Sequence, residues 1–253
     1  MNIGHEGGRF TKDGALGRRI TVWQAVKGYR YSIDSILLAW FCRPMRQARA
    51  VDLGAGCGVI GLVLLARNVV DFVVSIELQW ELAFLAARNA RENPGLGRMD
   101  VVQADARGGC NALAAGRFDL VVCNPPYFSR CSGKASPNSS REIARNESYM
   151  PLDQLLIASK RLLCNGGRLC LVHRPEKLGR ILGGASDMGL EPKRIRFVHP
   201  GKSEPANLFL LEATAGAKKG GLEIEPPLII YGGRKNNYTK EVKDMLMGAG
   251  IFS

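Results

Sequence analysis

Short apolar runs alternate with longer amphipathic segments through the middle of the chain. Strands are expected where aliphatic and β-branched residues dominate a short run, at residues 50–53, 73–76, 99–102 and 118–123. Helices are expected at residues 34–41, 59–67, 80–93 and 152–163, the first with Ser32 or Asp34 as its cap. This alternation predicts a parallel sheet wound by helices on both faces.

The rest of the chain divides around this core. Asn165, Gly166 and Gly167 are typical of a left-handed helix stop, and a strand is expected at residues 168–173. Residues 193–198 and 207–213 are predicted to close the sheet as an antiparallel pair. Residues 1–17 are polar and glycine-rich and are expected to form a flexible tail. A single domain is expected over residues 18–253, with a lead-in at 18–49, a core at 50–213 and an extension at 214–253.

A glycine-rich loop follows the first core strand. Gly54, Gly56 and Gly58 stand at alternate positions after Asp52. Glycines let the chain turn sharply and let a ligand approach the backbone, as in nucleotide-binding α/β proteins. The run from Gly56 also matches the dinucleotide fingerprint, but Gly54 has already ended the strand, and the Asp52 carboxylate would repel a pyrophosphate. A ligand with an amino group, such as S-adenosyl-L-methionine, suits Asp52 better.

Acidic residues end the next two predicted strands. Glu77 lies about 20 residues past the glycines, where an acid can bind both ribose hydroxyls. Leu78 and Trp80 follow and are placed to flank an adenine. Asp105 can accept a hydrogen bond from the adenine amino group, and Ala106 lies beside it. The expected cofactor-binding residues are therefore Asp52, Gly54, Gly56, Gly58, Glu77, Leu78, Asp105 and Ala106.

Asn124, Pro125, Pro126 and Tyr127 follow the strand at residues 118–123. The prolines have fixed φ and no N–H, and Asn124 is pushed out of the helical region by the proline after it. The result is a stiff loop with an amide, free carbonyl acceptors and an aromatic ring. These groups suit a planar substrate whose amino group donates to the Asn124 side chain and the Pro125 carbonyl. All four residues are catalytic candidates.

The charge of the chain favours a polyanionic partner. The formal net charge is +12, and basic residues recur at 9–30, 43–49, 193–202 and 234–243. A positive surface raises the affinity and on-rate for nucleic acid. Combined with an amine-binding loop, this charge makes nucleic acid the leading substrate class.

Other features bear on metal binding, disulfide bonds and the cellular compartment. The seven cysteines show no Cys-x-x-Cys spacing and the three histidines are far apart, so no metal site and no disulfide framework are expected. No apolar stretch approaches the ~18 residues that cross a membrane, and the N-terminus lacks the apolar region of a signal peptide. A cytoplasmic protein with reduced thiols is expected.

The motifs together resemble a known family. Asp52 to Gly58, Glu77, Asp105 and Asn124 to Tyr127 look like the class I S-adenosylmethionine-dependent amino-methyltransferases. Two further segments narrow the resemblance to one family within this class: Tyr29-Arg30-Tyr31-Ser32-Ile33-Asp34-Ser35 and Arg141-Glu142-Ile143-Ala144-Arg145. With them the chain is similar to the bacterial tRNA1(Val) (adenine(37)-N6)-methyltransferases.

The resemblance implies a Rossmann-like sheet of seven mostly parallel strands, one of them antiparallel. It implies methyl transfer from S-adenosyl-L-methionine to N6 of an unpaired adenine in RNA, in the anticodon loop of a tRNA. It also places Asp34 and Asn124 near the cofactor. Arg141 and Arg145 are expected to hold RNA phosphates, and Lys202 in the basic stretch at 193–202 is a third candidate.

Three alternatives stay open at this point. Protein-glutamine enzymes share the Asn-Pro-Pro-Tyr loop but usually carry a separate N-terminal helical domain. Enzymes that methylate a guanine amine in ribosomal RNA resemble a duplicated domain. A non-catalytic RNA-binding protein is disfavoured because Asp52, Glu77 and the loop are all intact. The RNA, the modified position and the oligomeric state are not readable from the residues.

Overall fold

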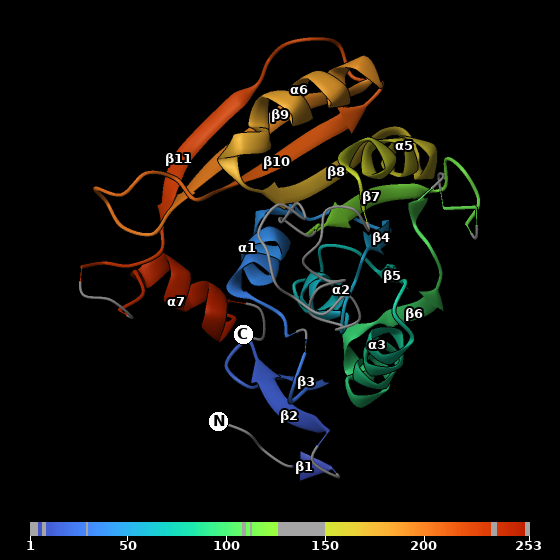
Figure 1. Cartoon of the computed structure of the whole chain (residues 1–253), viewed down its shortest axis with the longest axis vertical. Coiled ribbons are helices and arrows are strands. Elements are labelled where there is room, and N and C mark those ends of the chain that lie inside the picture. The colour runs from blue at the N-terminus through green and yellow to red at the C-terminus, as the bar shows by residue number, and fades with distance from the viewer. Residues whose placement is uncertain are drawn as a thin grey trace, which may run out of the picture.

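A single eight-stranded sheet forms the centre of the molecule in the computed structural model, which describes residues 5–6, 9–28, 30–107, 110–111, 113–125, 150–233 and 237–250. The strand order is β11-β9-β10-β8-β7-β4-β5-β6 (Figure 1). The strands are β4 (Arg49–Leu53), β5 (Phe72–Glu77), β6 (Arg98–Gln103), β7 (Phe118–Cys123), β8 (Leu163–His173), β9 (Leu190–His199), β10 (Leu208–Ala215) and β11 (Glu223–Ile229).

The strand directions confirm the predicted fold class. Every neighbouring pair is parallel except the two pairs that β10 makes with β8 and β9. The closing antiparallel pair was therefore predicted correctly. The sheet has eight strands where seven were expected, because β11 adds to β9 in a parallel register beyond the expected core.

Helices cover both faces of the sheet. They are α1 (Ile33–Phe41), α2 (Val59–Ala66), α3 (Trp80–Glu92), α5 (Leu152–Leu162), α6 (Leu178–Asp187) and α7 (Lys240–Met247), with short 3-10 turns η1 (Pro94–Leu96) and η4 (Pro175–Lys177). Successive strand residues point to opposite faces, so Ala50 of β4 packs with α1 and α2 while Val51 and Leu53 pack on the α5 and α6 side. Burial on both faces explains the continuous apolar runs in the sequence.

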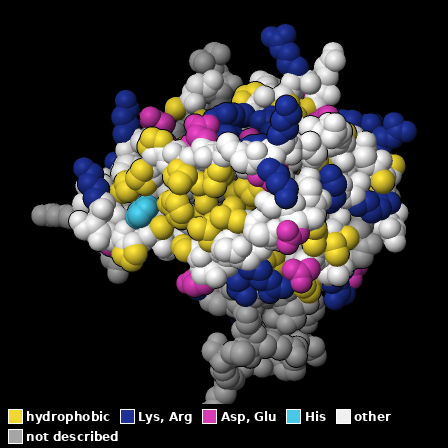
Figure 2. Space-filling model, turned by 90° about the horizontal axis from the view of Figure 1, so that it is seen from above, with side chains coloured by type: hydrophobic (Ala, Val, Ile, Leu, Met, Phe, Trp, Pro, Cys, Tyr) yellow, Lys and Arg dark blue, Asp and Glu magenta, His cyan; other side chains and the backbone are white. Residues whose placement is uncertain are grey.

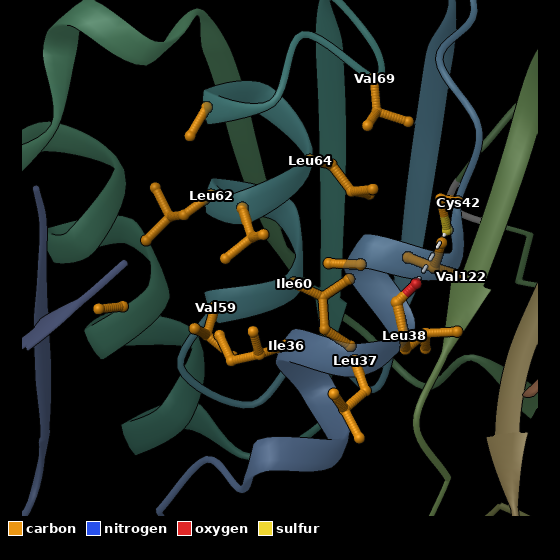
Figure 3. Close-up of a cluster of buried hydrophobic side chains, with 14 of the residues drawn as sticks. Ile36, Leu37, Leu38, Cys42, Val59, Ile60, Leu62, Leu64, Val69 and Val122 are labelled. Carbon is orange, nitrogen blue, oxygen red and sulfur yellow. Dashed lines mark hydrogen bonds between the residues drawn. The ribbon is translucent and has the colours of Figure 1, made fainter. Parts of the chain in front are cut away.

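Helices α1 and α2 pack directly against each other. Figure 3 shows Ile36 and Leu38 of α1 close to Ile60 of α2, with Val122 of β7 beside them. The entire length of α2 is buried. This packing holds the N-terminal segment that contains α1 against the strands that end in the glycine loop and at Asn124.

The expected flexible tail at residues 1–17 is wrong for its second half. Strand β2 (Phe10–Ala15) pairs antiparallel with β3 (Ile20–Ala25), and β1 (His5–Glu6) pairs with β2. Asn89 of α3 and Asn93, which caps the end of that helix, exchange hydrogen bonds with the β3 backbone, which anchors the hairpin to the core. The polar sequence of β2 lacks strand alternation, so local pattern could not reveal it.

The helix stop at Asn165 to Gly167 was also misplaced. Helix α5 ends at Leu162, and the chain continues at once as β8. Leu163 is buried and pairs with Phe118 of β7, which favours an extended backbone there. Gly166 keeps a positive φ of 80°, but inside the strand. Beyond residue 213, β11 joins the sheet and α7 contacts α1, so the extension is part of the main fold.

Candidate active site

The glycine loop connects β4 to α2 along the edge where the parallel strands end. Gly54, Gly56 and Gly58 all have positive φ, from 58° to 82°. A Cβ at Gly58 would collide with the Met99 methyl group and lie 3.2 Å from the Ala86 Cβ. The positive φ therefore favours glycine at position 58, and a Cβ there would also require Met99 and Ala86 to shift. The amide groups of Gly54 and Ala55 donate to the Ile76 carbonyl, which fixes the loop against β5.

Glu77 joins the glycine loop to the start of α3. Its buried carboxylate accepts hydrogen bonds from the Gly56 N–H and the Gln79 N–H, each at 2.8 Å. Burial raises the pKa of Glu77, while these backbone donors act against that rise. Each carboxylate oxygen retains a further lone pair. Glu77 is therefore positioned to accept from ligand hydroxyl groups beside the loop.

Asp52 lies deeper than its predicted role suggests. It is fully buried in β4, opposite Ser75 of β5. Neither carboxylate oxygen of Asp52 nor the Ser75 hydroxyl has a hydrogen-bond partner within the described part of the chain. Burial raises the pKa of Asp52 to about 7, and the Glu77 carboxylate adds to the rise. Any influence of Asp52 on a ligand must pass through the loop or follow a local opening.

Asp52→Asn is expected to stabilise the protein more at pH 8 than at pH 5. Because the pKa is raised from 3.8 to about 7 on folding, the carboxyl group favours folding below pH 3.8 and loses that contribution as pH rises through 7. Asparagine does not titrate. The free energy of unfolding of the variant relative to wild type should therefore rise by roughly 1–3 kcal/mol between pH 5 and pH 8.

Urea unfolding of both proteins at the two pH values measures this difference. An equal difference at pH 5 and pH 8 would show that Asp52 titrates as an ordinary carboxyl group.

Asp105 follows β6, two strands from β4, and is held by an ion pair. Its half-exposed carboxylate accepts from the Arg107 guanidinium at 2.5 to 3.0 Å. The Arg107 side chain lowers the pKa of Asp105. Asp105 is thus ionised and accessible, but a ligand amine must share it with Arg107. Ala106 beside it is buried.

Leu78 and Trp80 follow Glu77, and their side chains differ in exposure and direction. Leu78 is 38% exposed at the end of β5, as an adenine-flanking residue would be. Trp80 is 63% exposed, and its ring stacks on Phe84 one turn further along α3. The structure therefore directs the Trp80 ring along the helix.

Asn124 lies at the end of β7, next to the glycine loop. The Cys123 thiol donates to the Leu53 carbonyl at 3.0 Å, which joins the ends of β7 and β4. The Asn124 Nδ2 donates to the Ser35 Oγ at 3.0 Å. This bond orients the amide, because the Oδ1 atom must then point away from Ser35. Pro125 is buried behind Asn124.

Ser35 was missed by the sequence analysis. It is 1% exposed in the first turn of α1, and its own N–H donates to the Ser32 carbonyl. The resemblance drew attention to Ser32 and Asp34, and the structure places Asp34 in the same helical turn, partly exposed. The signal was present in the run Ser32-Ile33-Asp34-Ser35, but only the packing of α1 shows which hydroxyl faces Asn124.

Ser35→Ala is expected to lower kcat by roughly three- to tenfold, the effect of losing one hydrogen bond that orients a reacting group. The Kd for S-adenosyl-L-methionine and the Tm should change little. Ser35→Thr, which keeps the hydroxyl, should recover most of the loss. Steady-state kinetics with calorimetric cofactor titration distinguishes these effects. Unchanged kcat in Ser35→Ala would show that the amide is oriented without Ser35.

The remaining predicted residues lie elsewhere. Lys202 is exposed in the turn after β9. Strand β9 runs parallel to β7 with two strands between them, so the turn that contains Lys202 follows β9 at the same edge of the sheet as Asn124. Pro126, Tyr127, Arg141 and Arg145 lie outside the described residues.

Within the described ranges, no group of three or more His, Cys, Asp or Glu side chains is arranged to hold a metal ion. In the same ranges, every helix is too short or too polar to span a bilayer.

The sheet order and the site define a Rossmann-like methyltransferase fold, with the glycine loop on β4 and acidic side chains after β5 and β6. Residues 33–181 match the family model described as Methyltransferase small domain, which is more than half of the chain. The chain therefore belongs to the Methyltransferase small domain family. Its methyl donor is S-adenosyl-L-methionine, and the buried Glu77 carboxylate with two backbone donors beside a glycine loop fits an adenosine ligand.

Similar proteins have related names. A tRNA1(Val) (adenine(37)-N6)-methyltransferase of Bacteroides fragilis is 28% identical over 197 residues, 78% of this chain and 82% of the relative. The protein of the same name from Tolumonas auensis is 31% identical over 181 residues, 70% of this chain and 73% of the relative. The crystal structure of a predicted O-methyltransferase from Agrobacterium tumefaciens has a TM-score of 0.67 at 25% identity, covering 85% of this chain and 96% of that chain.

Proposed function

We propose that this methyltransferase acts on the exocyclic N6 of an unpaired adenine in RNA, in the anticodon loop of a tRNA. The observation that carries the proposal is the Asn124 amide. It lies at the end of β7, directly beside the glycine loop, with its Nδ2 engaged by Ser35. The Oδ1 atom of this amide is the kind of acceptor that an amine substrate needs.

The strand order supports a separate binding role for the group at each successive strand end along this edge of the sheet. Strands β7, β4, β5 and β6 are consecutive neighbours. Their ends present the amide of Asn124, the glycine loop, Glu77 and Asp105 in that order. Glu77 binds the ribose hydroxyls and Asp105 the adenine amine, with Leu78 and Ala106 beside the ring. Gly54, Gly56 and Gly58, with Asp34 and Asn124, would hold the methionine end, and Asp52 would act on it through the loop.

The chemistry requires no strong base. Bound S-adenosyl-L-methionine supplies an electrophilic methyl group on a sulfonium. Asn124 Oδ1 and the Pro125 carbonyl accept the two amine hydrogens and favour a pyramidal nitrogen, whose lone pair is then available for in-line attack. The proton leaves to solvent afterwards. Pro126 shapes the loop, and Tyr127 stacks on the base with about 1–3 kcal/mol. Alignment and electrostatics supply most of the rate.

The choice of RNA rests on charge and on the relatives. The formal net charge is +12, and Figure 2 shows Lys and Arg side chains around a hydrophobic patch on the face seen from above. Two relatives carry the name tRNA1(Val) (adenine(37)-N6)-methyltransferase. An anticodon-loop adenine is unpaired, so placing it in the site costs little unstacking energy. Arg141, Arg145 and Lys202 are proposed to contact phosphates of this RNA, in the cytoplasm where tRNA is found.

Other acceptors fit the site less well. A hydroxyl group that accepts a methyl group has one hydrogen to donate. Asn124 Oδ1 and the Pro125 carbonyl form a pair of hydrogen-bond acceptors, which matches the two hydrogens of an NH2 group. A protein glutamine and a guanine amine both have such a group. The basic surface disfavours the first, and the adenine-N6 names of the two relatives reported above disfavour the second.

Transfer of labelled methyl groups to separate acceptor pools tests the proposal. The pools are tRNA, ribosomal RNA and protein from cells that lack the enzyme. Label is expected in tRNA. Label in protein would favour glutamine methylation, and label in ribosomal RNA would favour the guanine alternative. Cofactor binding with no label in any pool would support a non-catalytic role.

A further inference from the structure

Helix α3 presents two large aromatic side chains to solvent. Trp80 is 63% exposed and Phe84 is 41% exposed. Their ring centroids are 5.7 Å apart with an interplanar angle of 21°, so they stack on each other at the surface. The two adjacent rings form a small apolar patch on which a planar group can stack. Neither ring packs into the two buried cores.

The two rings lie on one stripe of the α3 surface, and the residues further along this stripe are basic. Residues four and seven or eight positions further on in a helix share a face, so Arg88 and Arg91 continue the line that begins with Trp80 and Phe84. Arg91 is exposed. The Arg88 guanidinium lies 3.5 Å from the centroid of the Trp23 ring in the neighbouring hairpin. The stripe thus runs from aromatic to cationic along α3.

The stripe begins at the edge of the cofactor site. Trp80 is three residues after Glu77, and helix α3 lies at the side of the molecule next to β6 and the hairpin β2–β3 (Figure 1). Arg9 and Lys12 of that hairpin flank α3 through ion pairs with Glu81 and Glu92. A substrate that reaches Asn124 from solvent and extends along the sheet edge would meet this face.

We infer that the outer face of α3 is an RNA contact surface, on which an unpaired base of the substrate stacks against Trp80 and Phe84 while Arg88 and Arg91 approach its phosphates. The inference rests on the proposed RNA substrate. Stacked aromatic rings next to basic side chains are the usual platform for single-stranded nucleic acid, since every base has a π-face. An acidic protein segment would use the arginines but would leave the stacked rings without a matching planar group.

The test compares single and double variants with a matched control. Trp80→Ala and Phe84→Ala remove the rings from exposed helical positions, where alanine preserves the helix. Ile224→Ala is the control, because Ile224 is 66% exposed on β11 at the opposite end of the sheet. Trp80→Phe keeps a stacking ring. For each protein, the KM for tRNA, kcat at saturating tRNA, and Kd for S-adenosyl-L-methionine are measured, together with direct tRNA binding by filter retention.

Each alanine variant is expected to raise the KM and Kd for tRNA about tenfold, with kcat and the cofactor Kd within about twofold of wild type. Trp80→Phe and Ile224→Ala should behave like wild type. Unchanged tRNA binding in the double variant would overturn the inference. A raised cofactor Kd with unchanged tRNA binding would also overturn it, because Trp80 would then cover the cofactor adenine.

The outcomes separate this inference from the proposed function. If wild type methylates tRNA and the variants bind it normally, the surface assignment alone fails. If wild type methylates no RNA while the alanine variants still lose tRNA affinity relative to Ile224→Ala, the surface assignment holds and the proposed reaction fails.

Discussion

Asn124→Ala is expected to lower kcat by at least about 100-fold, the range seen when one preorganised group at the reacting atom is removed. The alanine loses the Oδ1 acceptor for the substrate amine and the Nδ2 donor to Ser35. The Kd for S-adenosyl-L-methionine should stay within about threefold of wild type, since one lost hydrogen bond contributes little to binding. Single-turnover methyl transfer with a parallel cofactor titration measures both quantities.

Asn124→Asp is the informative companion variant. Aspartate has nearly the same shape and can accept a hydrogen bond from Ser35 Oγ as well as from the amine. It should retain more activity than the alanine variant. Wild-type turnover in Asn124→Ala would show that this amide does not touch the reacting nitrogen, and the catalytic assignment would then be wrong.

Glu77→Gln is expected to raise the Kd for S-adenosyl-L-methionine about 10- to 100-fold, the range for a charge-assisted hydrogen bond in a buried site. The carboxylate accepts from Gly56 N–H and Gln79 N–H at 2.8 Å each. An amide offers one oxygen, so its NH2 group would face one of these N–H donors. The loop would lose its preformed shape as well as an acceptor for the ribose.

Asp105→Asn is the control for Glu77→Gln. Its carboxylate is half exposed and already paired with Arg107, so the cofactor Kd should rise less than tenfold, as is usual for an exposed, screened contact. Calorimetric titration of both variants decides the ranking, and the Tm of each unliganded protein separates binding from stability. Equal cofactor affinity in Glu77→Gln and wild type would remove Glu77 from the site.

The central sheet could be predicted because its signals are local. Strands β4, β5 and β7 are buried on both faces, so their sequences are largely apolar, and the edge strand β6 keeps a short apolar stretch at Val101 and Val102. The three loop glycines take positive φ, which glycine adopts without strain. These constraints act within a few residues and are visible without any tertiary information.

The features that were missed depend on distant partners. Strand β2 is polar and is held by β3, which Asn89 and Asn93 anchor to α3, more than 60 residues away. Strand β11 carries two prolines and pairs only at the edge of the sheet. Ser35 acquires its role from a contact 89 residues away in sequence. Asp52 stays a predicted cofactor residue, and its burial beside Ser75 follows from strand pairing that the sequence alone does not show.

Nucleoside analysis of tRNA methylated by the wild-type enzyme tests the central claim most directly. Unmodified tRNA is incubated with the protein and S-adenosyl-L-methionine, digested to nucleosides and separated by mass-resolved chromatography. The account predicts N6-methyladenosine as the product, absent when Asn124→Ala replaces wild type. A methylated guanosine, a ribose-methylated nucleoside, or no methylated nucleoside from an enzyme that binds the cofactor would contradict it.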